Sequence, residues 1–72
     1  MSRLKPVTWR EYVARLKALG FDGPYFGGNH PKMRRYDQTI IIPNKHDAEI
    51  GVGFLKRLLR QSGIKEDEWL GN

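Results

Sequence analysis

The two histidines of this chain, His30 and His46, are the side chains best suited to proton transfer, because imidazole changes charge near neutral pH. His46 stands beside Asp47 in a polar segment, and the chain has no cysteine. One histidine and one aspartate are too few ligands for a protein metal site. We therefore expect no bound metal and no other cofactor, and His30 is the stronger candidate for chemistry.

His30 directly follows Gly27-Gly28-Asn29, a run typical of a tight turn, and precedes a basic segment with Lys32, Arg34 and Arg35. Glycine lets a phosphate backbone approach closely because it has no Cβ. Cations beside the turn would hold the phosphates. A histidine placed there can take a proton from a ribose 2′-OH or give one to a leaving oxygen. The pattern predicts an RNA-cleaving site in which His30 is catalytic and Gly28, Asn29 and the three cations contact the RNA.

The same residues have a second interpretation. His30 can be a surface histidine in a glycine turn, next to a basic strand that is merely solvated. A single histidine is a weak signal for catalysis, because it lacks the partner groups of a complete site. Composition and spacing leave both interpretations open.

The composition favours a polyanionic partner. Lys and Arg total 13 against 8 Asp and Glu, which gives a net charge of +5 and a pI near 9.9. Many small soluble proteins are also basic for solubility alone. The 72 residues predict one domain over residues 1–72, with no deep cavity. The lack of cysteine, of a signal peptide and of an apolar run near the ~20 residues of a membrane span predicts a cytoplasmic location.

The first expected element is a helix over residues 9–19, after a short and poorly anchored arm at residues 1–7. Thr8 and Glu11 have the spacing of a capping box, in which each side chain accepts a free backbone N–H. Gly20 and then Phe21 are typical of a helix end with a left-handed glycine. Apolar residues recur at spacings of three and four along this segment, so they share one face.

Three short strands are expected next, at residues 25–26, 32–36 and 39–42, with Pro43 ending the third. Turns at 27–29 and 37–38 join them into an antiparallel meander. A loop at 44–53 leads to a helix over about 53–62, which ends at Gly63-Ile64, and residues 66–70 add a helical turn that packs back on the core. The predicted class is α+β, with both helices on one face of a three-stranded antiparallel sheet. Lys56 and Arg57 of the second helix would add RNA contacts.

Four segments of this order are similar to the HicA toxin family, small mRNA interferases of toxin–antitoxin systems. A capped helix ends in Leu19-Gly20-Phe21, and Gly28-Asn29-His30 resembles the family's Gly-Ser-His turn. A strand ends in Ile40-Ile41-Ile42-Pro43, and Gly53 to Ile64 resembles the family's final helix. The likeness covers about residues 9–70. Asn29 stands where the family usually has serine, and Pro31 follows the histidine.

The resemblance implies a fold like that of double-stranded-RNA-binding domains. It also implies mRNA cleavage without a metal by the histidine of the turn, here His30, and a HicB antitoxin that covers it. We expect Ile40 and Ile42 to face the helices, so that Ile41 points to the other side of the sheet. Ile41 could there meet the antitoxin or a second copy of the chain in a homodimer. Two other classes stay open: a non-catalytic RNA-binding module, and a protein-interaction domain whose charge serves solubility.

Overall fold

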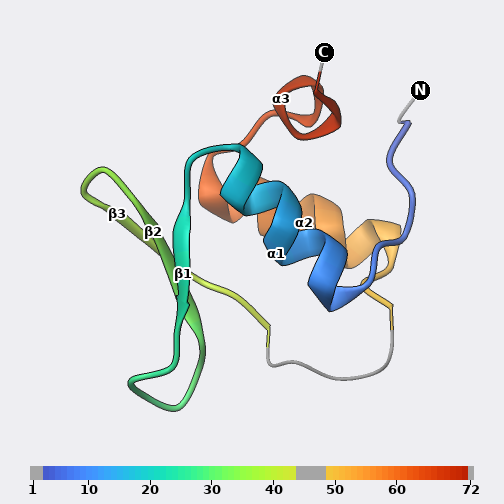
Figure 1. Cartoon of the computed structure of the whole chain (residues 1–72). Helices are drawn as coiled ribbons and strands as arrows, with labels where there is room; N and C mark the ends of the chain where they lie inside the picture. Colours follow the sequence, from blue (N-terminus) through green and yellow to red (C-terminus); the bar gives the residue numbers. More distant parts are fainter. Residues whose placement is uncertain (1–2, 44–48, 72) are drawn as a thin grey trace.

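The computed structural model describes residues 3–43 and 49–71. In chain order, its elements are α1 Trp9–Ala18, β1 Asp22–Tyr25, β2 Lys32–Arg35, β3 Gln38–Ile41, α2 Val52–Ser62 and α3 Glu66–Leu70. The strands form one antiparallel sheet in the order β1-β2-β3. Both long helices lie on the same side of this sheet (Figure 1). The predicted α+β class, with a helix, three strands and a helix, is confirmed.

Local signals set the helix ends as expected. The Thr8 hydroxyl accepts the Glu11 N–H at 3.1 Å, and the Glu11 carboxylate accepts the Thr8 N–H at 2.8 Å, which completes the capping box. At the other end, Gly20 has φ +99° and the Phe21 N–H reaches the Leu16 carbonyl at 3.0 Å. Only glycine adopts that backbone conformation without a steric cost, so α1 stops there.

The second helix ends in the same way. Gly63 has φ +70°, and the Ile64 N–H donates to the Leu59 carbonyl at 3.0 Å. This helix starts at Val52, one residue before the predicted start. The predicted final turn is α3, whose Trp69 is only 3% exposed and belongs to the core.

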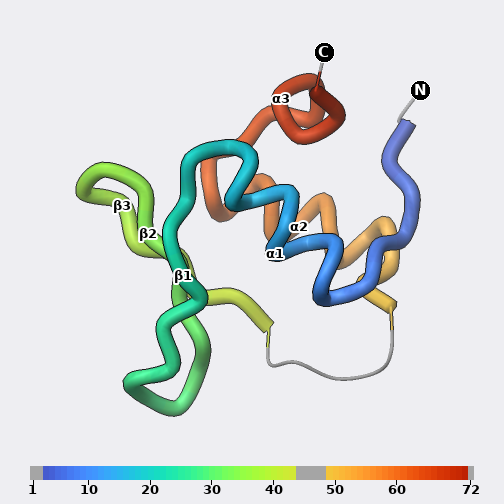
Figure 2. Tube along the Cα trace, in the orientation of Figure 1, coloured from blue at the N-terminus to red at the C-terminus, as the bar shows by residue number. Residues whose placement is uncertain are grey.

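The strand bounds differ from the prediction because pairing between strands decides them. The first strand begins at Asp22, which pairs with Arg34, rather than at Tyr25. Pro24 is accommodated there because β1 is an edge strand, where a missing N–H costs least. The second strand stops at Arg35, which pairs with Gln38, so the turn lies at 36–37 instead of 37–38. The Cα trace shows the two hairpin turns at opposite ends of the sheet (Figure 2).

The sheet has one buried face and one open face. Met33, Ile40 and Ile42 are at most 7% exposed, whereas Ile41 is 59% exposed. The expectation for these isoleucines is confirmed, because side chains alternate between faces along a strand. The buried face packs on apolar residues of the helices, which include Tyr12, Val13, Leu16, Leu55, Leu58 and Leu59.

The N-terminal segment is better anchored than expected. Leu4 is 8% exposed, and Val7 forms a two-way backbone bridge with Ile50, with N–H to carbonyl distances of 3.1 and 2.7 Å. The prediction of a poorly anchored arm is therefore wrong for residues 3–7. Residues 44–48 of the predicted loop at 44–53, with His46, lie outside the described residues.

Candidate nucleic-acid interface

His30 is exposed at the turn that joins β1 to β2. This turn spans residues 26–31, and bends follow one another from Gly27 to His30. A Cβ added at Gly27 would meet no atom within 4 Å, and neither Gly27 nor Gly28 has a positive φ. The fold itself therefore does not require glycine at either position. Close approach by a ligand is a separate reason for residues without a side chain.

Lys32 brings a positive charge to this turn. A Cβ at Gly28 would lie 3.9 Å from the Lys32 Nζ, so the ammonium group lies beside the glycine backbone. Lys32 is the first residue of β2 and is exposed. The structure thus places a cation, an open backbone and the His30 imidazole on one short hairpin.

Pro31 holds the base of the turn. The ring is buried, and the Pro31 carbonyl accepts the Ile42 N–H at 3.0 Å. Proline removes one N–H from the ladder, but its carbonyl still continues the pairing of β2 with β3. The backbone next to His30 is therefore anchored, although the His30 side chain is exposed.

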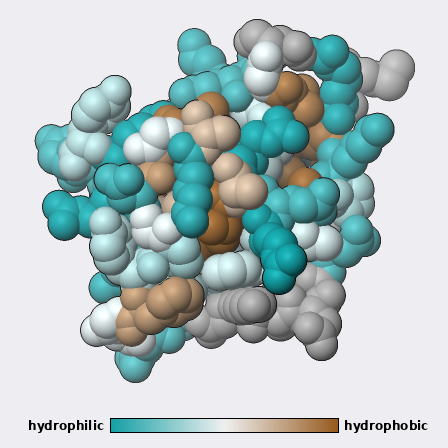
Figure 3. All heavy atoms as spheres, viewed as in Figure 1, coloured by the Kyte–Doolittle hydropathy of each residue, from teal (hydrophilic) through white to brown (hydrophobic). Residues whose placement is uncertain are grey.

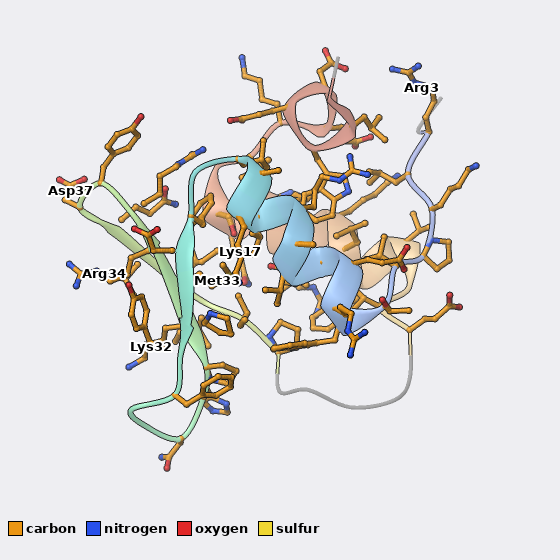
Figure 4. All side chains as sticks on the ribbon, in the orientation of Figure 1. Arg3, Lys17, Lys32, Met33, Arg34 and Asp37 are labelled. Carbon is orange, nitrogen blue, oxygen red and sulfur yellow. The ribbon has the colours of Figure 1, made fainter. Side chains whose placement is uncertain are left out.

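Arg34 shares the open face of the sheet with Lys32. Both side chains point away from the helices (Figure 4), and Arg34 pairs across the strands with Thr39 and Asp22. Neither cation forms an ion pair with a carboxylate in the part of the chain that the structure describes. Their charges are available to an anionic ligand.

Arg35 has a different position from its two neighbours in the predicted RNA-binding set. Its guanidinium donates to the Leu19 carbonyl at 3.2 Å, lies 3.4 Å from the Glu68 carboxylate and stacks 4.5 Å from the Phe21 ring centroid. These contacts lie on the helix side of the sheet. Arg35 therefore joins β2 to the end of α1 and to α3, and it is not part of the open face.

Lys56 and Arg57 are exposed on α2. The helix α2 lies on the helix side of the sheet, opposite to its open face (Figure 1). The structure does not bring them together with Lys32 and Arg34.

Two exposed aromatic residues, predicted only as a strand, stand beside the turn. Tyr25 is 51% exposed and Phe26 is 65% exposed. Figure 3 shows an apolar patch over the β1–β2 hairpin, at the lower left of the view. An aromatic pair between a proline and two glycines, followed by a basic strand, was the sequence signal for this feature.

No group of three or more His, Cys, Asp or Glu side chains in residues 3–43 and 49–71 is placed to hold a metal ion. No helix in this part of the chain has the length and apolar character to cross a bilayer.

The fold and the hairpin define a small α+β protein with an exposed histidine in the β1–β2 turn. On the open side of its sheet are two cations that form no ion pair with a described carboxylate. The sequence model described as "HicA toxin of bacterial toxin-antitoxin" matches residues 9–64, from the first residue of α1 to two residues past the end of α2. The chain therefore belongs to the HicA toxin family, and membership implies an antitoxin partner. Searches of curated proteins and of solved structures found no match.

Proposed function

We propose that this chain is a HicA-like toxin that cleaves mRNA, with His30 as the acid/base group. The observation that carries the proposal is the exposed His30 on an open glycine turn with the Lys32 Nζ beside Gly28. Membership in a toxin family supports it. Lys32 and Arg34 would hold phosphates on either side of the cut, and Gly28 and Asn29 would let the RNA backbone approach.

The chemistry follows from the 2′-OH of RNA. The 2′ oxygen attacks the adjacent phosphorus, and the bond from phosphorus to the 5′ oxygen breaks. His30 either accepts the proton of the 2′-OH or donates one to the departing 5′ oxygen, and water serves as the other partner. The products are a 2′,3′-cyclic phosphate and a 5′-OH. No metal-bound water is needed because the substrate supplies the nucleophile, so cleavage should resist EDTA.

The test is the pair of variants His30→Ala and His30→Gln. Cleavage of mRNA should slow by a factor of about 10²–10⁴, the usual contribution of a positioned acid/base group. The free energy of unfolding should change by no more than ~0.5 kcal/mol, because the side chain is exposed. RNA affinity should persist, since phosphate contacts supply most of it. Equal cleavage by wild type and variants would transfer the role to another residue, with His46 tested next.

A specific observation favours a second candidate, a non-catalytic RNA-binding module. Among residues 3–43 and 49–71, none forms a hydrogen bond with the His30 side chain. A general base is usually oriented by a second group, so the bound RNA would have to orient this imidazole. Wild-type protein that binds RNA and never cuts it would establish this second candidate.

The proposal extends to the partner. We infer that a HicB-like antitoxin covers the open face of the sheet, where Ile41 is 59% exposed and pairs across the strands with Lys32. An antitoxin bound to this face would block Lys32 and Arg34 together with the turn. A homodimer through the same face would also block these residues. We further propose a cytoplasmic location, which fits a protein that acts on mRNA.

A further inference from the structure

We propose that Tyr25 and Phe26 form a stacking platform for unpaired bases, so that the site selects single-stranded RNA. This inference rests on the proposed RNA binding, and it does not depend on whether His30 cuts. Neither residue has a role in the family resemblance given above.

Both rings are exposed to a degree that packing in the core does not explain. Phe26 is 65% exposed and Tyr25 is 51% exposed, whereas Phe21, of the same hairpin region, is 2% exposed. Folding gains little from an aromatic ring that stays in water, because the hydrophobic effect acts on area removed from solvent. Contact with a ligand is therefore the better use for two such adjacent rings.

Both aromatic residues lie next to the proposed RNA-binding residues. Tyr25 is the direct cross-strand partner of Lys32, and Lys32 in turn pairs with Ile41. Directly opposed residues of an antiparallel pair project to the same face, so Tyr25 shares the open face with Lys32. Phe26 begins the turn that carries His30. One exposed ring thus lies beside Lys32, and the other stands at the start of the turn with His30.

Exposed rings beside cations suit one kind of ligand in particular. Proteins that bind single-stranded nucleic acid pair a basic surface with aromatic rings on which successive bases stack. A paired helix hides the faces of its bases, so it cannot use such rings. The charges of Lys32 and Arg34 are not paired with described carboxylates, which favours a polyanion over a neutral apolar peptide. The combination fits an unpaired RNA segment.

The experiment measures RNA affinity by fluorescence anisotropy in the full chain carrying His30→Ala, so that the probe is not cut. The probes are a short unstructured RNA and the duplex that it forms with its complement. Adding Phe26→Ala should raise the Kd for the single strand by about 5- to 150-fold, the usual effect of losing one stacked base. Phe26→Trp should keep the affinity, and Phe26→Leu should lose it as alanine does.

Phe54 supplies a matched control. It is 43% exposed on α2, away from the hairpin, so Phe54→Ala should leave the affinity unchanged. Thermal melts would check that each variant is folded. The inference is overturned if Phe26→Leu binds like the parent, if the duplex binds as tightly as the single strand, or if the variants lose only antitoxin binding. A parent protein that binds neither RNA would instead refute the proposed function.

Discussion

Replacing Lys32 and Arg34 together with alanine should weaken RNA binding and leave the fold intact. Replacing Arg35 should instead destabilise the fold and leave RNA binding unchanged. The three residues are neighbours in sequence, but alternation along β2 separates them. Lys32 and Arg34 project from the open face, and Arg35 contacts Leu19, Phe21 and Glu68 on the helix side. Comparing the two variants therefore tests which of these side chains lie on the open face of the sheet.

The magnitude for the double variant comes from counterion release. Each lost single-strand phosphate contact lowers the log–log salt slope by about 0.7, so two lost contacts lower it by about 1.4. Both side chains are exposed and neither forms an ion pair with a described residue. The free energy of unfolding should therefore stay within about 0.5 kcal/mol of wild type.

The magnitude for Arg35→Ala comes from three contacts. A hydrogen bond from a charged group contributes about 1.5–3 kcal/mol, and the bond to Leu19 is long at 3.2 Å, so we take the lower end. Stacking on Phe21 adds roughly 0.5–1 kcal/mol. The ion pair with Glu68 contributes little, because that carboxylate is 41% exposed. The variant should lose about 2 kcal/mol of stability and keep the wild-type salt slope.

The assay combines RNA titrations over a series of salt concentrations with urea unfolding of the same samples. Lys56→Ala with Arg57→Ala is the matched control, since it removes the same charge from α2. A reduced slope with unchanged stability in Arg35→Ala would contradict the assignment of faces. An unchanged salt slope in the Lys32 and Arg34 variant would show that RNA binds elsewhere on the protein. The cations of α2 would then be tested next.

Three further predictions concern stability and the partner. Thr8→Ala should cost about 1 kcal/mol in urea unfolding and Thr8→Ser much less, because serine keeps the cap; equal losses would refute the capping role. Hydrogen bonds from Thr8 lower the pKa of the Glu11 carboxyl. The stability that this carboxylate adds to the helix cap should therefore be lost as the pH falls through that lowered pKa. Burial raises the pKa of Tyr12 from 10.0 to about 12. The stability that the neutral Tyr12 phenol contributes should therefore be fully present below pH 10 and fall by roughly 3 kcal/mol as the pH rises through about 12. Tyr12→Phe should remove this fall. Ile41→Lys should break antitoxin binding or self-association while RNA binding persists; if both protein contacts survive in pull-down and sedimentation, the open face is not the partner's surface.

The helix ends were predictable from sequence because each depends on groups a few residues apart. Thr8 and Glu11 satisfy each other's backbone N–H groups, and Gly20 and Gly63 end their helices by a local backbone conformation. The class of the fold and the burial of Ile40 and Ile42 follow from periodicity in the same way. The turn with His30 was also visible, since glycines mark it directly.

Contacts between distant segments were decided only in the tertiary structure. The strands begin and end where partners exist, so Asp22 joins β1 because Arg34 lies opposite. Val7 is held by Ile50, and no local signal near either residue predicts that bridge. Arg35 looked equivalent to Arg34 in a basic run, but packing brings Leu19, Phe21 and Glu68 to one of them alone. The sequence shows which residues can interact with near neighbours in the chain. Packing decides which of several similar side chains stay free for a ligand, because one face of the sheet is buried against the helices and the other is exposed to solvent.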